Sequence, residues 1–587
     1  MRSRVREAFH EVFTQLRAEG LDLPESVPLV LEKPRRAELG DLATNVALAV
    51  AKAVGRPPRA LAEALCGALL ALPDTPFAAV EVAGPGFLNL RVKDRVVLAV
   101  LGEVLAQGER YGQHPPVPGE RVLLEFVSAN PTGPLHLAHA RGAVVGDVLA
   151  RLLRAAGLAV ETEYYVNDLG AQVLKLAASV RAAHLGEPPP EGGYGGAYVA
   201  ELAQALRASA PALLDGPDGP LAERCVEEVL GGIRRTLDRL GIHFARFFSE
   251  RSLGDGRLEA TLDALASGGH LEARDGALFF RGGDTDKDRV LRKSSGDLTY
   301  FASDLAYHRD KLARGHTRLV DVWGADHHGY IPRMRAGLEA LGLPGEAFEV
   351  LLLQMVKLLK DGKEVRMGKR LGNFITVDEV LDEVDEATGH PGAGRDALRF
   401  LILARSHESP VEFDLAVASA QSVENPVFYA QMTHARMCSI LHRAEHSEEL
   451  LPAREAGVLY VPDAPDPVLV EKLTLPEERA ILAACDAFPE LVREAAEARA
   501  PHRVAFWALE FAQGFASYFT RMQRVHDAPI LPQKGVREAD PGWVRAWDWE
   551  TTRARLLWLR AVRQVYANAL ALLGVEAPTR MTRSAEP

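Results

Sequence analysis

The 587-residue sequence lacks several features that define whole classes of proteins. No run of residues approaches the roughly 18 apolar residues that a membrane-spanning helix needs. The four cysteines lie far apart and form no CxxC pair of the kind that binds zinc or makes a redox centre: they are Cys66, Cys225, Cys438 and Cys485. We therefore expect no membrane segment and reduced thiols in the core.

An excess of basic residues is also missing. The chain has 68 Lys and Arg against 80 Asp and Glu, a formal net charge of −12. A general electrostatic attraction to nucleic acid is therefore absent, and any RNA binding must come from local surfaces. Residues 1–20 lack the continuous apolar core of a secretory signal, so we expect them to form an exposed amphipathic helix of a cytosolic protein.

Three zones of different composition are present, with no internal repeat, and the length predicts two to four domains. The first zone, residues 1–112, contains the strand-like VEVAGPGFLNLRV, in which Gly84, Pro85 and Gly86 predict a turn, and it leads into the polar linker GQHPPVPGE. The second zone is 113–415 and the third is 416–587.

The second zone alternates strand and helix patterns, as a parallel sheet does. Two βαβ units are predicted, and each helix ends at a glycine, Gly157 or Gly342. The first unit comprises 122–127, 136–156 and 159–166, and the second comprises 319–323, 331–341 and 348–353. Between the units, residues 185–245 begin with EPPPEGGYGGAY, which predicts a surface excursion too short for an independent catalytic domain.

The third zone is helical, with almost no strand signal. Its last long helix has one apolar stripe and arginines off that stripe: the stripe holds Leu556, Leu559, Val562, Tyr566, Ala569 and Leu573, and the arginines are Arg553, Arg560 and Arg563. A helical bundle is expected.

The stretch EFVSANPTGPLHLAHARG, residues 125–142, follows a buried strand and opens a helix. It therefore lies at the carboxyl edge of a parallel sheet, where helix N-termini and free amides favour phosphate. Gly133 and Pro134 tighten the entry to the helix. His136 and His139 share a face of its first turn, so both can bond to one phosphate group. Two alternatives stay open: the histidines cap or pack, or they bind a metal, for which no third ligand is nearby.

PTGPLHLAH resembles the HIGH signature of class I aminoacyl-tRNA synthetases. The resemblance implies that His136 and His139 stabilise the α-phosphate of ATP during adenylate formation. It also implies that ATP contacts the residues around them: Pro131, Thr132, Gly133, Leu137 and Ala138. Ala138 departs from the family, which usually has a glycine there so that the adenine can approach the backbone.

A second stretch, DGKEVRMGKRLGN at residues 361–373, resembles the KMSKS loop of the same class. It implies ATP contacts from Arg366, Met367, Gly368 and Arg370, and it makes Lys369 a catalytic residue. The Lys369 ammonium can approach the β- and γ-phosphates when the loop closes. Alone, a basic glycine-containing loop is also what a solvated surface loop looks like, but this one follows the two histidines by about 230 residues.

Further stretches are similar to arginyl-tRNA synthetases, and the similarity covers nearly the whole chain. They are YYVNDLGAQ, SSGDLTYFASDLAYH, VWGADHHGY, DALRF, ENPVFYAQMTHAR and LLGVEAPTRM. The resemblance implies an α/β fold: a Rossmann-type parallel-sheet catalytic domain, an N-terminal α+β domain for the tRNA elbow, and a C-terminal all-α helical bundle for the anticodon.

The resemblance also implies an arginine site. Tyr300 and Asp304 would lie against the guanidinium with Glu125 as a second carboxylate, and Ser128, Asn130 and His327 would complete the site, the last two near the α-amino end. A planar guanidinium with five donors requires fixed acceptors, which discriminates against lysine. The alternative for each carboxylate, considered alone, is that it is an ordinary surface or capping residue. His327 and His328 beside Asp326 also read as a metal site.

For RNA, the resemblance places Phe87 and Asn89 against a D-loop base, where stacking and an amide hydrogen bond suit an unpaired base. The alternative is that Phe87 belongs to the core. In the helical domain it implies RNA contacts from Tyr429, His434, Arg436 and Met581, with Met432 standing where an aromatic residue is usual.

The implied activity has two steps: ATP with Mg²⁺ activates L-arginine, and the adenylate then esterifies the 3′-terminal adenosine of tRNA(Arg). The family generally forms adenylate only with tRNA bound. We expect a cytoplasmic monomer with no structural metal, no membrane contact and no editing site. Two rivals remain, another class I synthetase and a non-enzymatic RNA-binding relative, the latter suggested by Ala138 and Gly368.

Overall fold

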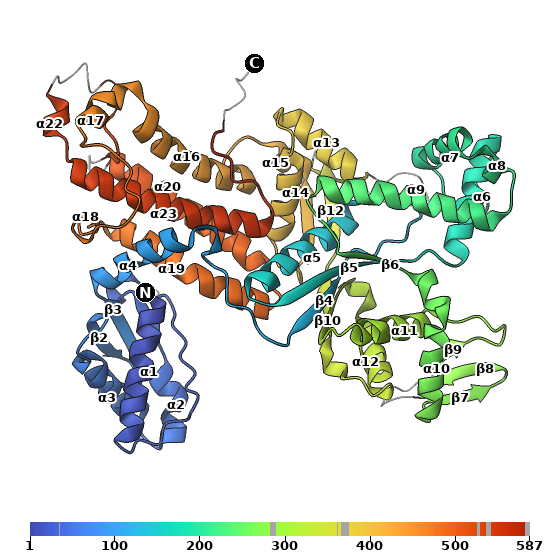
Figure 1. The fold of residues 1–587 in the computed structure, drawn as a ribbon, viewed down its shortest axis with the longest axis horizontal. Coiled ribbons are helices and arrows are strands. Elements are labelled where there is room, and N and C mark those ends of the chain that lie inside the picture. Colours follow the sequence, from blue (N-terminus) through green and yellow to red (C-terminus); the bar gives the residue numbers. More distant parts are fainter. Residues whose placement is uncertain are drawn as a thin grey trace.

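The computed structural model describes residues 1–34, 36–281, 289–360, 362–365, 375–524, 529–533, 535 and 542–581. Figure 1 shows a lobe at the amino terminus, a central parallel sheet with two lobes attached, and a helical bundle. Among the described residues, no helix combines the length and apolar character needed to cross a membrane. Three of the four cysteines are buried, Cys66 is half-buried, and all four are free thiols.

The amino-terminal lobe is an α+β unit built around a three-stranded antiparallel sheet of order β1-β3-β2. Its elements are α1 (Arg2–Ala18), η1 (Ala37–Leu39), β1 (Leu42–Thr44), α2 (Val46–Val54), α3 (Pro58–Ala71), β2 (Phe77–Ala83) and β3 (Phe87–Val92). The predicted turn at 84–86 joins β2 to β3. The predicted amphipathic helix is α1, whose apolar face packs on the lobe through Val5, Phe9 and Val12 while its polar face is exposed.

A five-stranded parallel sheet of order β11-β10-β4-β5-β6 forms the centre of the molecule. Its strands are β4 (Arg121–Glu125), β5 (Ala159–Val166), β6 (Arg246–Ser249), β10 (Arg318–Gly324) and β11 (Phe348–Leu353). The helices α5 (Leu137–Ala155) and α12 (Ile331–Ala340) connect strands of the two βαβ units, so both units are confirmed within two residues at each end. The strand order reverses between β4 and β10.

Residues 171–239 form a helical lobe with its own buried core. It comprises α6 (Ala171–Leu185), α7 (Ala197–Ser209), α8 (Pro211–Leu214) and α9 (Asp218–Arg239). The expected surface excursion is therefore an ordered unit, and it begins earlier than predicted, at α6. Leu176, Leu206 and Leu221 are fully buried in it.

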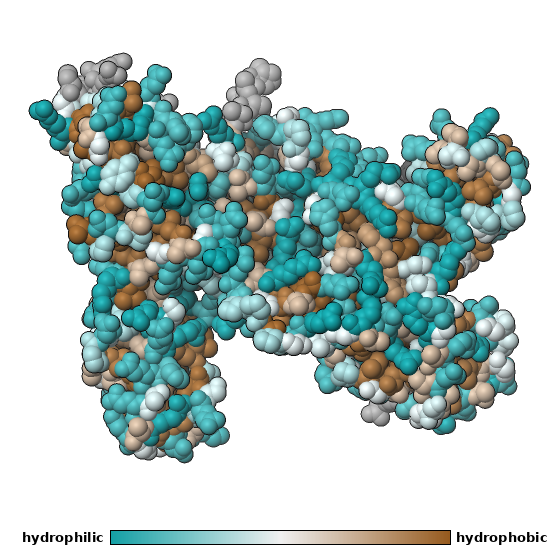
Figure 2. Space-filling model, viewed as in Figure 1, coloured by the Kyte–Doolittle hydropathy of each residue, from teal (hydrophilic) through white to brown (hydrophobic). Residues whose placement is uncertain are grey.

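A second lobe follows β6, and the sequence did not predict its small sheet. It comprises η3 (Glu250–Asp255), α10 (Arg257–Ser267), β7 (Leu271–Arg274), β8 (Ala277–Phe280) and β9 (Arg289–Arg292), and it leads into α11 (Tyr300–Ala313). The space-filling view shows this strand lobe and the helical lobe on either side of a hollow (Figure 2).

Between the parallel sheet and the bundle lies a mixed segment that ends the second zone. It comprises β12 (Val356–Lys360), β13 (Lys363–Val365), α13 (Val377–Thr388), α14 (Ala393–Leu403), β14 (Val411–Asp414) and α15 (Leu415–Ser419). The short helices η4 (Ala325–Tyr330) and η5 (Gly345–Ala347) flank α12 within the second βαβ unit. β12 pairs with both β13 and β14.

The carboxyl-terminal zone is the expected helical bundle. Its helices are α16 (Pro426–His446), η7 (Glu448–Leu450), α17 (Leu451–Glu455), α18 (Pro467–Val470), α19 (Pro476–Glu497), α20 (His502–Arg524), α22 (Trp543–Ala546) and α23 (Trp549–Leu573). The predicted stripe of the last helix is buried. α4 (Asp94–Gln107), with η2 (Gly108–Arg110), belongs to the first zone in sequence, yet α4 packs against α19 and α23 (Figure 1).

Candidate active site

The site lies where the order of the parallel strands reverses. β4 pairs with β5 on one side and with β10 on the other. In such sheets a crevice opens at the carboxyl ends of the strands beside this reversal, and ligands bind there. The chain after β4 carries the first signature, and the chain after β10 carries His327.

A strained turn directly after β4 sets the direction of the chain that carries the first signature. Val127 and Ser128 have φ of 70° and 39°, in the left-handed region that is unfavourable for residues other than glycine. The Ser128 hydroxyl donates to Glu125 Oε1 at 2.8 Å and accepts from the Tyr165 amide at 3.1 Å. These two bonds hold the turn, so Ser128 positions the loop and Glu125 acts through it.

His136 and His139 are together at the start of α5, as predicted. Their rings stack with centroids 3.7 Å apart and an interplanar angle of 18°. His136 is the N-cap, and its backbone amide donates to His139 Nδ1 at 3.3 Å. Capping and a phosphate-facing position are therefore compatible. Ala138, between them, is exposed, whereas Leu137 is buried in the core.

The loop before the histidines is covered by the helical lobe. The Tyr198 hydroxyl of α7 donates to the Thr132 carbonyl at 3.0 Å. A Cβ at Gly133 would come within 3.2 Å of the Tyr198 ring, so a larger residue there would push this ring away from the loop. Pro131 and Thr132 are buried. Asn130 donates from its amide to Gln172 Oε1 at 3.0 Å.

Most of the second signature lies outside the described residues. Arg366, Met367, Gly368, Lys369 and Arg370 are all in this part of the chain, so their predicted roles stay predictions. The chain that follows is placed: Thr376 pairs with His136 in an antiparallel bridge, and the Val377 amide donates to the Leu135 carbonyl at 2.9 Å. Thr376 and Val377 therefore lie beside the first signature.

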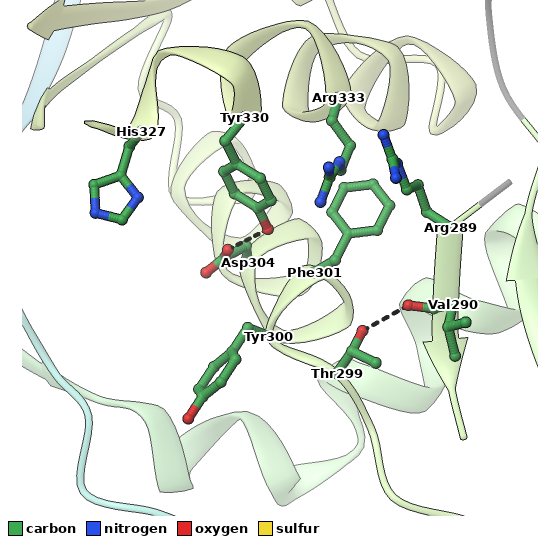
Figure 3. Close-up of a pocket in the computed structure, with 9 residues that line it drawn as sticks. All are labelled: Arg289, Val290, Thr299, Tyr300, Phe301, Asp304, His327, Tyr330 and Arg333. Carbon is green, nitrogen blue, oxygen red and sulfur yellow. Dashed lines mark hydrogen bonds between the residues drawn. The ribbon is translucent and has the colours of Figure 1, made fainter. Parts of the chain in front are cut away.

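Tyr300, Asp304 and His327 line one pocket of about 480 Å³, as expected for an arginine site (Figure 3). The Tyr330 hydroxyl donates to Asp304 Oδ2 at 2.6 Å and fixes that carboxylate. Burial raises the pKa of Asp304, while the hydrogen bond from Tyr330 acts in the other direction. The Tyr300 side chain is 64% exposed and is available to a ligand. Glu125, Ser128 and Asn130 are not among the residues that line this pocket.

Glu250 is a carboxylate near Asp304 that the sequence did not single out. It follows the carboxyl end of β6, at the same sheet edge, and is 7% exposed. Burial, together with the negative charge of Asp304, raises its pKa to about 7, against hydrogen bonds from Ser303 and Tyr165. Glu250 does not itself line the pocket, but a cation bound near both carboxylates would favour their ionised forms.

The Glu125 side chain is engaged in the core by a buried cation. Lys311 Nζ donates to Glu125 Oε2 at 2.6 Å and to Asp321 Oδ1 at 3.0 Å, and Lys311 has no exposed surface. His308 lies between Asp321 and the Asp304 carbonyl, with its two ring nitrogens 2.9 Å and 2.8 Å from these acceptors. Burial lowers the pKa of Lys311, but Asp321 and Glu125 outweigh it and raise that pKa. Glu125 shares Lys311 with Asp321 and does not line the pocket of Asp304, and its direct contact with a guanidinium stays a prediction.

In the amino-terminal lobe, Phe87 is 43% exposed, so the alternative that it belongs to the core is wrong. Asn89, two residues along β3, is only 9% exposed. The strand therefore presents an aromatic ring to solvent, with a nearly buried amide beside it.

In the helical bundle, the expected RNA residues do not all face outward. His434 is 4% exposed, and its Nδ1 bonds to the Pro578 carbonyl at 2.9 Å. The side chain is therefore buried against the chain at Pro578 and is not exposed to RNA. Tyr429 and Arg436 are half-buried, and the Arg436 guanidinium lies 5.2 Å from the Phe519 ring centroid.

In the described ranges, no three His, Cys, Asp or Glu side chains are grouped so that they could hold a metal ion. His327 is paired only loosely with Asp326, at 3.5 Å, and both are exposed.

Family models match three parts of the chain. The model described as arginyl tRNA synthetase N terminal domain matches residues 1–92. The model of the tRNA synthetases class I (R), catalytic domain, matches residues 100–187. The DALR anticodon binding domain model matches residues 430–581.

Similar proteins match over nearly the whole length. An arginine–tRNA ligase of Nitratidesulfovibrio vulgaris (strain DSM 19637 / Miyazaki F) is 44% identical over 575 residues, spanning 96% of this chain and 97% of that protein. An arginine–tRNA ligase of Frankia alni is 42% identical over 570 residues, with 95% and 96% covered. The solved structure of Thermus thermophilus arginyl-tRNA synthetase superposes with a TM-score of 0.74 at 23% identity and covers 99% of this chain and 100% of that one, which shows a shared fold.

Proposed function

The chain belongs to the arginyl-tRNA synthetase family, and from that premise we propose how its residues carry the reaction. It is an arginine–tRNA ligase: it activates L-arginine with ATP, releases pyrophosphate and transfers the arginyl group to the 3′-terminal adenosine of tRNA(Arg). The observation that carries the residue assignment is the placement of Asp304, held by Tyr330, in one pocket with Tyr300 and His327.

Asp304 and Glu250 accept hydrogen bonds from the guanidinium of arginine. Asp304 is held by Tyr330, and Glu250 is buried near it, so both acceptors are fixed before the substrate arrives. A charged, planar donor is the partner that two such acceptors favour, and lysine offers only one point charge to them. Tyr300 covers the guanidinium from the open side, and His327 with Asn130 meets the α-amino end.

Glu125 and Ser128 serve this site by positioning. The hydrogen bond between them holds the strained turn at Val127 and Ser128, from which the phosphate loop, residues 129–136, starts. Lys311 fixes Glu125 by donating to its other carboxylate oxygen. The arginine carboxylate must attack the α-phosphate in line, so a shift of this turn would misplace the reacting atoms.

His136 and His139 stabilise the α-phosphate of ATP at the amino terminus of α5, with Pro131, Thr132, Gly133, Leu137 and Ala138 around the nucleotide. The positive end of the helix favours the phosphate there, and the stacked rings present two donors on one side. Lys369, with Arg366, Met367, Gly368 and Arg370, approaches the β- and γ-phosphates, and the support for this is that Thr376, shortly after them in the chain, pairs with His136. ATP enters as its Mg²⁺ complex.

tRNA docks on two surfaces. The exposed Phe87 ring stacks on an elbow base beside Asn89, and Tyr429, Arg436 and Met581 contact the anticodon side, with His434 holding the segment that carries Met581. The domains are 1–112, 113–415 and 416–587. The enzyme works as a cytoplasmic monomer.

The test is aminoacylation of bulk tRNA with each labelled amino acid in turn. Arginine alone is expected to be esterified, and only with ATP present. Charging with a different amino acid would overturn the substrate assignment, and binding of tRNA without any charging would make the chain an inactive relative.

A further inference from the structure

The pocket that contains Asp304 has a second, positive end. Arg289 of β9 and Arg333 of α12 line the same pocket, and Figure 3 shows both side chains on the far side of Tyr330 from His327. The pocket is therefore bipolar: a carboxylate lies at one end and two guanidinium groups lie at the other.

Neither guanidinium is neutralised in the part of the chain that the structure describes. The Nε atoms of Arg289 and Arg333 are buried without a hydrogen-bond partner. Burial, and then the charge of Arg289, lower the pKa of Arg333. Its guanidinium faces rings, 5.0 Å from the Tyr330 centroid and 5.9 Å from the Phe301 centroid. An anion bound beside the two guanidinium groups would supply the charged partner that they lack.

Neighbouring arginines in the same lobe show the contrast. Arg292, three residues from Arg289, donates to both carboxylate oxygens of Glu259 at 2.8 Å and 2.9 Å. Arg257 pairs with Asp310 at 2.8 Å. Arg292 and Arg257 thus each have a carboxylate partner within the fold, whereas Arg289 and Arg333 have none among the described residues.

Arg333 also sits at an unfavourable place in its helix. It is the third residue of α12, whose first turn contains no acidic residue. The amino-terminal end of a helix carries a partial positive charge, so a cation there adds to the excess. Three positive features thus converge on one end of one pocket.

We propose that Arg289 and Arg333 form an anion subsite that holds a phosphodiester group of the 3′-terminal strand of tRNA. The proposal rests on the function given above, in which this strand must reach the arginine pocket. ATP phosphates meet His136 and His139, and no residue of α5 or of the loop before it lines this pocket. The carboxylate of the substrate must lie toward the same phosphates. Of the anionic groups in the reaction, only the phosphodiester backbone of tRNA is left to bind at the end of the pocket that holds Arg289 and Arg333.

The experiment uses the full chain with R289Q and R333Q, and with R292Q as the matched control from the same strand. Thermal melting first shows that each variant is folded. Dissociation constants are then measured over a range of salt for two RNAs, complete tRNA(Arg) and a transcript that lacks the unpaired 3′ end, and KM values are measured for arginine and ATP.

R289Q and R333Q are expected to weaken binding of complete tRNA by about fivefold or more and to lower the salt slope by about 0.7 per lost phosphate contact. Binding of the shortened transcript, and both KM values, should stay within about twofold of wild type. R292Q should change none of these quantities.

Three results would overturn the subsite. Equal weakening of both RNAs would place the contact elsewhere on tRNA. A rise in the KM of arginine or ATP without an effect on complete tRNA would assign the pair to a substrate carboxylate or to ATP phosphates. No change at all would leave the arginines without a ligand. Failure of the wild type to charge arginine is a separate outcome and counts against the function, because it does not involve these variants.

Discussion

The Lys311 ammonium donates to Glu125 Oε2 at 2.6 Å from a side chain with no exposed surface. The Ser128 hydroxyl donates to the same carboxylate, so the ion pair is linked to the strained turn at the start of the phosphate loop. Through Asp321 and His308, the same cation reaches the backbone of Asp304. One buried charge thus connects the phosphate loop to the arginine pocket.

Lys311→Met should therefore lower both stability and activity. Removing one partner leaves buried carboxylates without a cation, which costs about 3 to 5 kcal/mol of unfolding free energy. Denaturant unfolding measures the loss, and kcat/KM for arginine should fall as the turn relaxes. The double variant Lys311→Met with Glu125→Gln should regain part of the stability, because one carboxylate charge goes with the cation. If the double variant is as unstable as the sum of the two single variants, the pair is not the coupling element.

The arginine pocket should respond to pH through Glu250, whose pKa is raised to about 7. Only the ionised carboxylate accepts well from a guanidinium, so arginine binding should weaken as pH falls below about 7, by up to about tenfold per unit. For folding the sign is opposite: a carboxyl whose pKa is raised in the folded state stabilises it at low pH, and that contribution is lost as pH rises from 4.5 to about 7.

The measurement is KM for arginine from pH 5.5 to 8.5 in wild type and in Glu250→Gln. The variant should have a higher KM and a flatter profile in this range. Identical slopes in the two proteins would show that another group titrates.

Asp304→Asn should impair arginine use far more than ATP use. The change removes a charged acceptor that Tyr330 holds in place, with an expected loss of about 2 to 4 kcal/mol in transition-state binding, while the phosphate loop is untouched. Steady-state kinetics decides it: kcat/KM for arginine should drop by about 30-fold or more, with the KM for ATP unchanged. Values within twofold of wild type for arginine would remove Asp304 from the pocket.

Periodicity alone predicted the parts of the fold that are long and regular. Both βαβ units and the buried stripe of α23 follow from apolar spacing, and so does the edge at which His136 lies. The same reasoning could have placed His434, because it shares a stripe with Val427, Ala430 and Met437 and is therefore buried.

Other features depend on residues that meet only in three dimensions. Glu250 lies in a short 3₁₀ segment with no periodic signal, and its importance comes from the nearby Asp304. The partners of Lys311 come from three different elements. The four-residue strands β7, β8 and β9 are too short to stand out from the surrounding loops.

The alanine in the first signature offers a simple steric test. Ala138 is exposed on the first turn of α5, where the nucleotide is expected, so we expect its methyl group to lie near the adenine. Ala138→Gly should leave kcat intact and leave the KM for ATP equal or lower. Glycine in a helix costs about 0.5 to 1 kcal/mol of stability, which thermal melting would register. A large rise in the KM for ATP would mean that the methyl group packs productively against the nucleotide.

Activation of arginine should require tRNA, and the structure offers a route for that dependence. Arg399 of α14 is fully buried and pairs with Asp147 of α5, while its Nε donates to the Leu573 carbonyl at the end of α23, at 3.0 Å. The signature helix and the last helix of the anticodon bundle thus share one side chain, and RNA docked on the bundle can bias the position of α5.

Arginine-dependent exchange between ATP and pyrophosphate should be nearly absent with protein alone and should appear when tRNA(Arg) is added. His136→Ala should then lower that exchange by about two orders of magnitude or more while the dissociation constant for tRNA changes little, because the histidine meets phosphate only at the reacting centre. Exchange that is equally fast without tRNA would contradict the coupling, and an undiminished rate in His136→Ala would remove this histidine from the chemistry.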